Sequence, residues 1–139
     1  MHVAYLLLAL LLYPRGCESR AYSEAQAKQY HYMELAMASL GRGYTWRAYE
    51  AVTTDGYILT LFRIIADKHG DKIEGQGRHG PLLMQHGFTT DSISWFDVSN
   101  VSRAALPVQL FEEGFDVWLG NNRGTRHSRK HQWLDADIH

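Results

Sequence analysis

Cysteine is nearly absent from the sequence, since Cys17 is the only one among 139 residues. A single cysteine can form no disulfide within the chain, and it cannot build a cysteine-based zinc site. The chain must therefore be stabilised by an ordinary hydrophobic core. Its composition, 45% hydrophobic and 21% charged, is typical of a globular protein.

An excess of positive charge is also lacking. The 14 Lys and Arg residues are balanced by 15 Asp and Glu residues, which gives a formal net charge of -1 with neutral histidines. Proteins that bind nucleic acid usually carry a marked excess of Lys and Arg, so we exclude nucleic acid as a partner. Eight histidines make the charge sensitive to mild acid, because histidine titrates at about pH 6.5.

No Lys or Arg precedes the apolar run at residues 3–13. This run is shorter than the stretch of about 20 residues that spans a bilayer, but it fits the apolar region of a secretory signal peptide. Ser19 and Ala21 occupy the −3 and −1 positions of a cleavage site. We therefore predict a signal peptide at residues 1–21 and a mature chain at residues 22–139. An uncleaved membrane anchor is the alternative, because the positively charged region is weak.

Residues 23–40 are predicted to form an amphipathic helix. Ser23 and Gln26 fit a capping box at its start, and Gly41 is a natural stop. One face carries apolar residues at helical spacing, namely Tyr30, Met33, Met37 and Leu40. A stripe of this kind is most often core packing, and we assign it no further role.

A β-hairpin is predicted next. Residues 46–53 and 57–65 are rich in aromatic and β-branched residues, and Asp55-Gly56 between them is a strong signal for a two-residue turn. Strict alternation in the second strand places one set of side chains on a common face, namely Ile58, Thr60, Phe62 and Ile64.

Two short apolar runs, residues 81–85 and 115–119, are predicted to be buried strands. Residues 104–113 between them have helical spacing, and residues 92–96 fit a short helix or turn. The order strand, helix, strand implies a parallel pair with a right-handed crossover, so the fold class is α/β. Residues 115–119 are the last strand predicted, and we expect them to form an unpaired apolar edge that invites aggregation.

Three short motifs carry weaker signals. Residues 75–80 match G-x-G-x-x-G, but a strand rather than a helix follows, so we reject dinucleotide binding in favour of a flexible loop. His127 and His131 have the spacing of two zinc ligands on a helix, but Ser128 stands where the general-base Glu would be. We therefore predict a solvated basic loop there and no metal. Asn100 opens an N-x-S sequon and is a candidate glycosylation site.

The most informative motif is His86-Gly87-Phe88, where a buried strand is expected to turn sharply. A glycine permits backbone conformations that a Cβ forbids, so the next amide, on Phe88, can point into a cleft. In α/β-hydrolases an amide from the loop after the third strand is one donor of the oxyanion hole. On its own the motif is weak, because a plain strand-end turn is the more common explanation.

Five separate segments strengthen that interpretation. They are residues 49–59, a hairpin; residues 83–88, a strand and turn; the pair Ser94-Trp95; residues 114–124, which contain D-V-W-L-G-N-N-R-G; and residues 128–131. In this order and with these gaps they resemble the acid lipase family, which includes gastric and lysosomal acid lipases. The resemblance implies the N-terminal part of an α/β-hydrolase fold, with an opening hairpin, the first parallel strands and an incomplete sheet.

The resemblance also implies a function, which is hydrolysis of carboxylic ester bonds in neutral lipids such as triacylglycerols or sterol esters. The reaction would take place at a lipid–water interface, in a secreted or lysosomal protein, with no metal or organic cofactor. Phe88 would donate its backbone N–H to the oxyanion from the turn that His86 and Gly87 begin. The segment Asn121-Asn122-Arg123-Gly124 would brace the loop after the next strand, a structural role that we favour over substrate contact.

The chain departs from the family pattern in three places. Residues 43–46 stand where the family usually has a Tyr-Pro turn, and Phe88 stands where Leu is common. The larger departure is that no G-x-S-x-G occurs in the 139 residues, and the Asp and His of the triad follow that motif in the family. None of His86, His127 and His131 can be assigned as the base. We therefore expect this chain by itself to be inactive.

Three interpretations of the chain remain. The first is a part of a full lipase. The second is a natural short product without catalysis, such as a lipid-binding or interaction protein. The third is a product that does not fold. Ester hydrolysis, lipid binding without turnover and a cooperative melt distinguish them.

Overall fold

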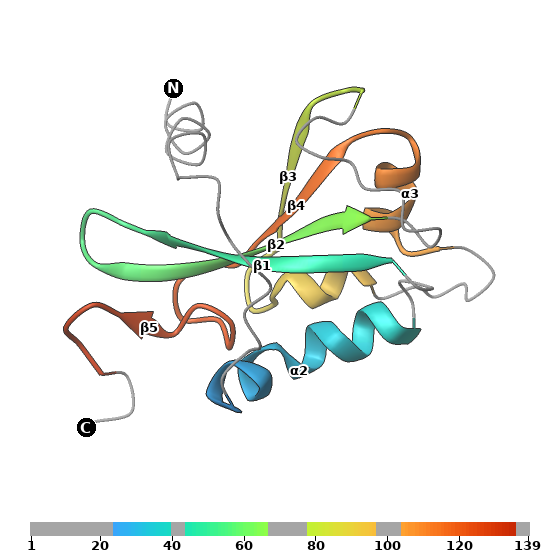
Figure 1. Cartoon of the computed structure of the whole chain (residues 1–139). Coiled ribbons are helices and arrows are strands. Elements are labelled where there is room, and N and C mark those ends of the chain that lie inside the picture. The colour runs from blue at the N-terminus through green and yellow to red at the C-terminus, as the bar shows by residue number, and fades with distance from the viewer. Residues whose placement is uncertain (1–23, 40–43, 67–77, 97–103, 136–139) are drawn as a thin grey trace.

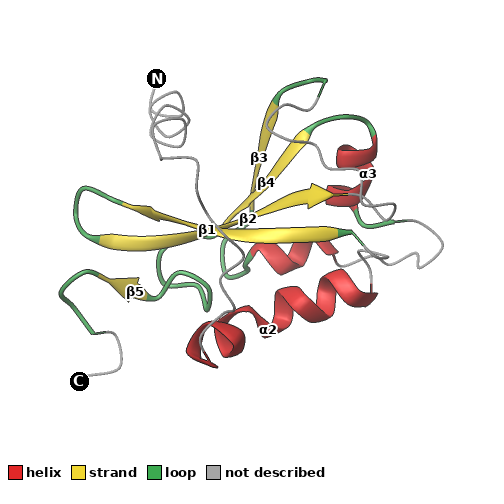
Figure 2. Ribbon diagram, viewed as in Figure 1, coloured by secondary structure: helices red, strands yellow, loops and turns green. Residues whose placement is uncertain are grey.

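The computed structural model describes residues 24–39, 44–66, 78–96 and 104–135. They form a mixed five-stranded sheet with helices packed against it (Figures 1 and 2), with strand order β1-β2-β4-β3 and with β5 paired to β2. The α/β class predicted from the sequence is confirmed. In chain order the elements are α2 (Glu24–Ser39), β1 (Thr45–Val52), β2 (Tyr57–Ala66), β3 (Pro81–Gln85), the 3₁₀ helix η1 (Ser92–Phe96), α3 (Leu106–Glu112), β4 (Asp116–Gly120) and β5 (Lys130–His131).

Helix α2 forms as predicted and buries its apolar stripe against the sheet. Tyr30, Met33 and Met37 are each at most 3% exposed, and the Tyr30 ring meets the Phe62 ring of β2 edge to face at 5.6 Å. Leu40, the last residue of the predicted stripe, lies outside the described residues. On β2 the predicted face is buried at Thr60, Phe62 and Ile64, whereas Ile58 at its start is only half-buried. Leu61, which was predicted on the opposite face, is buried as well.

Thr53 and Tyr57 close the hairpin that joins β1 to β2, so its loop contains three residues, 54–56, and not the two that were predicted. The N–H of Thr53 donates to the carbonyl of Tyr57 (2.8 Å), and the N–H of Gly56 donates to the carbonyl of Thr53 (2.9 Å). Gly56 has a φ of +90°, whereas Asp55 has no positive φ. A two-residue type I′ turn needs a positive φ at both positions, so the chain takes the three-residue loop that ends on a left-handed glycine.

Strands β3 and β4 pair in parallel, as the sequence predicted. Strand β4 also pairs with β2, so it lies inside the sheet, and Val117 and Leu119 are fully buried. The expectation that residues 115–119 would form the unpaired edge is therefore wrong. Among the described strands the edge next to β4 is β3, where Met84 is buried but Leu83 is 41% exposed. Residues 81–85 were predicted to be a buried strand, and this prediction is wrong because β3 lies at the edge of the described sheet with most of its residues exposed or half-buried.

The connection from β3 to β4 contains η1 and α3, both close to their predicted positions. Residues 97–103 lie outside the described residues, so the hand of the crossover and the glycosylation of Asn100 stay predictions. Gly80 directly precedes β3, and the preceding residues of the rejected G-x-G-x-x-G segment are described only from residue 78 onward.

The predicted signal peptide at residues 1–21 also lies outside the described residues. Within the part of the chain that the structure describes, no helix is both long enough and apolar enough to cross a membrane.

Candidate functional site

The carboxyl ends of β3 and β4 lie side by side, because the two strands are parallel and Gln85 is opposite Gly120. The residues that follow, 86–88 and 121–124, therefore meet at one edge of the sheet. In open α/β sheets, ligands bind in the crevice outside the carboxyl ends of the strands. The structure thus brings together the two segments that the sequence singled out.

The ring of His86 joins these two segments. His86 is 8% exposed, and its Nε2 accepts a hydrogen bond from the backbone N–H of Asn122 at 3.0 Å. Its Nδ1 lies 2.8 Å from the carbonyl oxygen of Gly87. A carbonyl can only accept, and an N–H can only donate. The hydrogen-bond network therefore assigns the neutral ring with its proton on Nδ1.

The turn after β3 is strained at Thr89, which has a φ of +67°, and not at Gly87. A Cβ added to Gly87 would meet nothing closer than the hydroxyl of Thr90 at 4.0 Å. The expectation that a glycine is needed here for its backbone conformation is therefore wrong. A β-branched residue with positive φ is an outlier, and strain of this kind is concentrated at functional sites.

Phe88 lies between Gly87 and Thr89 and is 96% exposed. No hydrogen bond joins its backbone N–H to any described residue. The peptide group at the carboxyl end of β3 therefore presents a backbone donor on an exposed turn.

Asn121 is 3% exposed and bonds to β2, to η1 and to another residue of its own loop. Its side-chain oxygen accepts from the N–H of Ser92 (3.1 Å), and its side-chain nitrogen donates to the carbonyl of Thr60 (3.1 Å). Its own carbonyl accepts from the hydroxyl of Ser128 at 3.1 Å. The side chain thus links β2, η1 and the loop after β4.

Arg123 contacts the hairpin turn. Its guanidinium lies 2.6 Å from the carboxylate of Asp55 and 4.4 Å from the centre of the Tyr57 ring. Hydrogen bonds from Thr53 and from Arg123 lower the pKa of Asp55. Both partners of the ion pair are 52% exposed, so the pair contributes little to stability. Gly124 follows with a φ of +84°, and a Cβ added there would meet nothing within 4 Å.

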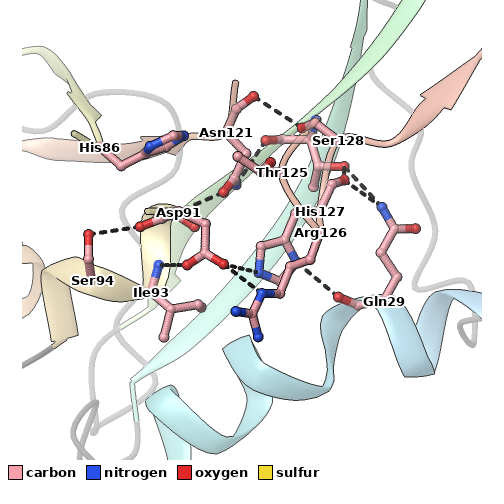
Figure 3. Close-up of polar contacts among 12 residues, drawn as sticks. Gln29, His86, Asp91, Ile93, Ser94, Asn121, Thr125, Arg126, His127 and Ser128 are labelled. Carbon is pink, nitrogen blue, oxygen red and sulfur yellow. Dashed lines mark hydrogen bonds and ion pairs between the residues drawn. The ribbon is translucent and has the colours of Figure 1, made fainter. Parts of the chain in front are cut away.

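A partly buried polar cluster that the sequence did not reveal lies beside the carboxyl ends of β3 and β4 (Figure 3), and it contains Asp91, Arg126, His127 and Ser128. Asp91, at the start of η1, forms an ion pair with Arg126 (2.8 Å) and accepts from the N–H of Ile93 (3.0 Å). His127 and Ser128 are fully buried, so the prediction of a solvated loop is wrong at these two residues. Their basic neighbours Arg126, Arg129 and Lys130 are exposed, and no local pattern in the sequence distinguishes the two inward-facing positions.

His127 ties α2 to the loop after β4 through a reciprocal pair of hydrogen bonds. Its Nδ1 donates to the carbonyl of Gln29 (2.9 Å), and the side chain of Gln29 donates to the carbonyl of His127 (2.6 Å). Its Nε2 is buried without a hydrogen-bond partner in the described part of the chain. Burial lowers the pKa of His127, although the nearby Asp91 carboxylate opposes this shift.

His127 and His131 do not converge on a common point. The Nε2 of His131 donates to the carbonyl of Asp55 at 2.9 Å, whereas His127 is bonded to α2. Within residues 24–39, 44–66, 78–96 and 104–135, no group of three or more His, Cys, Asp or Glu side chains is placed to hold a metal ion.

Comparison with known proteins agrees with this arrangement. Residues 38–99 match a family described as a partial alpha/beta-hydrolase lipase region. Gastric triacylglycerol lipase of Rattus norvegicus is 38% identical over 95 residues, which are 68% of this chain and 23% of that protein. A putative lysosomal acid lipase/cholesteryl ester hydrolase of Crotalus adamanteus is 41% identical over 99 residues, 71% of this chain and 24% of that protein. The chain belongs to the acid lipase family.

The match to acid lipases includes the elements that meet at the carboxyl ends of β3 and β4. The family region at residues 38–99 contains β1, β2, β3, the turn after β3 and η1. Lipase member M of Mus musculus is 34% identical over 132 residues, or 95% of this chain, an alignment long enough to include the loop after β4 as well. The chain spans 30% of the length of that lipase, and less of the two relatives above.

Proposed function

We propose that the protein is part of an enzyme that hydrolyses carboxylic ester bonds of neutral lipids, with the backbone N–H of Phe88 as a donor to the oxyanion. The observation that carries the proposal is the position of this N–H. It lies on an exposed turn at the carboxyl end of β3, and no described residue accepts a hydrogen bond from it. In α/β-hydrolases an amide from this loop supplies one oxyanion donor, and the amide after the nucleophile supplies another.

In the proposed reaction a serine hydroxyl attacks the ester carbonyl while a histidine takes the hydroxyl proton and an aspartate orients the histidine. Negative charge then develops on the carbonyl oxygen, and a donor such as the Phe88 N–H stabilises it by about 3 kcal/mol. The histidine returns the proton to the departing alcohol, and water hydrolyses the acyl-serine. Because the 139 residues contain no G-x-S-x-G, the serine, aspartate and histidine would come from further sequence.

The names of the relatives indicate neutral-lipid esters as the class of substrate. The rat relative is a triacylglycerol lipase, and the snake relative carries the name cholesteryl ester hydrolase. We therefore propose triacylglycerols or sterol esters, taken from a lipid–water interface. The exposed Phe88 side chain adds apolar surface next to the proposed donor.

Export through a signal peptide at residues 1–21 is part of the same proposal, with the mature protein secreted or delivered to lysosomes. Expression in cultured animal cells tests it, because the recovered protein should begin at Tyr22. A mobility shift that is lost in Asn100→Gln would support glycosylation at that residue. A recovered protein that still begins at Met1 would favour the membrane anchor instead.

The decisive test of the function is to sequence the transcript through and beyond the codon for His139 and to assay the protein from the complete reading frame. A frame that continues to G-x-S-x-G, then Asp, then His, with hydrolysis of trioleoylglycerol or cholesteryl oleate, would support the proposal. A stop codon directly after His139 would contradict it for this product. Binding of lipid without turnover would then favour a non-catalytic lipid-binding protein.

A further inference from the structure

The carbonyl oxygen of Gly87 accepts two hydrogen bonds from within its own turn. The Nδ1 of His86 lies 2.8 Å from this oxygen, and the hydroxyl of Thr90 donates to it at 3.0 Å. A carbonyl oxygen has two lone pairs, so both of its acceptor positions are used. This carbonyl is therefore held in one orientation from two sides.

The orientation of this carbonyl also fixes the direction of the Phe88 N–H. The Gly87 C=O and the Phe88 N–H belong to the same planar peptide group, and in a trans peptide they point in opposite directions. The described residues contain no cis peptide bond. Because His86 and Thr90 hold the oxygen on one side of the peptide, the N–H must point away from them, out of the turn.

The ring of His86 is itself held in place by the neighbouring loop. Its Nε2 accepts from the backbone N–H of Asn122, so the ring cannot rotate without breaking that bond. The same bond requires Nε2 to be unprotonated, which leaves the proton on Nδ1, where the Gly87 carbonyl needs a donor. Burial of the ring, at 8% exposure, further restricts it. The loop after β4 thus determines, through one ring, how the turn after β3 is oriented.

We propose that His86 and Thr90 are positioning residues that aim the Phe88 N–H at the reacting carbonyl oxygen. The inference rests on the proposed function, because it assigns a task to the donor proposed there. Thr89, with its φ of +67°, lies between the two ends of the Thr90–Gly87 bond. The bond therefore helps to maintain a strained turn that would otherwise relax. In this way the donor is oriented before the charge develops, which is what makes an oxyanion donor effective.

Two pairs of variants separate positioning from simple folding. Thr90→Val removes the hydroxyl, whereas Thr90→Ser retains it. His86→Leu removes both ring bonds, whereas His86→Asn retains a side-chain N–H at the place of Nδ1 and loses only the acceptor for Asn122. If the hydrogen bonds to the Gly87 carbonyl position the Phe88 N–H, Thr90→Ser and His86→Asn should each keep most of the kcat that Thr90→Val and His86→Leu lose.

The first readout uses the 139-residue chain and needs no catalysis. Nuclear magnetic resonance of the labelled chain should show His86 with its proton on Nδ1. The Phe88 amide nitrogen resonance, which responds to hydrogen bonding at the Gly87 carbonyl, should shift in Thr90→Val and return in Thr90→Ser. A ring protonated on Nε2, or a Phe88 resonance that is the same in both Thr90 variants, would overturn the inference whatever the protein hydrolyses.

The second readout uses the protein from the complete reading frame. Thr90→Val and His86→Leu should lower kcat about tenfold to a hundredfold, the range expected when a reacting group is misplaced by a fraction of an ångström to an ångström. KM should change little, and melting temperatures of the matched variants should agree. Unchanged kcat in both variants would overturn the positioning role while leaving the hydrolase function intact. A wild-type protein without hydrolysis would instead refute the proposed function, and the resonance result would still show whether the carbonyl is held.

Discussion

Asp91 and His127 face each other at the junction of α2, η1 and the loop after β4, with Oδ2 of Asp91 3.9 Å from Nε2 of His127. This separation is too long for a hydrogen bond. Nε2 has no hydrogen-bond partner among the described residues, while Asp91 is already paired with Arg126. The arrangement suits a neutral imidazole, and it makes the junction sensitive to the protonation of one buried ring.

We predict that acid destabilises the chain through His127. Burial lowers the pKa of this residue in the folded chain, so in the range between the folded pKa and the unfolded value of about 6.5 the unfolded chain binds the extra proton. The contribution to stability is therefore complete above about pH 6.5, and it is lost as the pH falls through the folded pKa. Urea unfolding on both sides of this range measures the effect.

His127→Phe should flatten this dependence, because phenylalanine keeps the edge-to-face contact that His127 makes with Phe62 at 5.0 Å and does not titrate. His131→Phe serves as the control, since His131 is only half-buried. An equal loss of stability with acid in the wild type and in His127→Phe would contradict the prediction.

Gly56→Ala should destabilise the chain by about 2–4 kcal/mol, the sum of left-handed strain and a steric clash. The φ of Gly56 is +90°, and a Cβ there would lie 2.6 Å from the ring of Trp133. Gly124→Ala is the matched control, because Gly124 has a φ of +84° and open space around it. Gly124→Ala should lower stability only by the cost of a left-handed backbone at a residue with a Cβ, about 1 kcal/mol. Equal losses in the two variants, measured by urea unfolding, would show that the rings of Trp133 and His131, which lie 2.6 and 2.7 Å from the added Cβ, do not pack on the hairpin turn.

Asn121→Ala should destabilise the chain by about 2–4 kcal/mol. The substitution leaves the buried N–H of Ser92 and the buried carbonyl of Thr60 without their partner, and each such group costs about 1–3 kcal/mol. Asn122→Ala should cost far less, because the Asn122 side chain is exposed and its bond to His86 uses the backbone. Differential scanning calorimetry of the two variants checks the contrast, and similar losses would refute the bracing role of Asn121.

Phe62→Ala should be among the most damaging single changes in the core. Phe62 is fully buried, and its ring meets those of Tyr30 and Trp46 edge to face at 5.6 and 5.1 Å. Truncating a buried phenylalanine costs about 3–5 kcal/mol. Leu59→Ala, at a half-buried position on the same strand, should cost less than half as much. A small loss in Phe62→Ala by chemical unfolding would mean that α2 does not pack on this face.

The elements that could be predicted from the sequence are those whose pattern is local. The strand at residues 57–65 and the helix α2 were predicted from the periods of a strand and a helix, and both elements are confirmed. The edge of the sheet could not be predicted, because strand order depends on which distant segments pair. Residues 115–119 therefore lie inside the sheet, between β2 and β3.

The site likewise combines features that could be predicted from the sequence with features that could not. The meeting of the turn at His86 with the loop at Asn121 follows from parallel strands, so it could be anticipated. The burial of His127 could not, because the basic residues around it dominate the local sequence, while its partner Gln29 lies 98 positions away. The two hydrogen bonds on the Gly87 carbonyl were equally hidden, since they depend on side-chain orientation rather than on residue type.

The most direct test of Phe88 as an oxyanion donor is to remove its N–H from the protein made from the complete reading frame. Phe88→Pro lacks this donor, and Phe88→Leu keeps it with a similar apolar side chain. Replacement of Phe88 by phenyllactic acid, which exchanges the N–H for an ester oxygen, serves if the proline variant does not fold. We predict that kcat for ester hydrolysis falls about a hundredfold to a thousandfold without the N–H and stays near the wild-type value in Phe88→Leu. Full activity in a folded variant that lacks the N–H would contradict it.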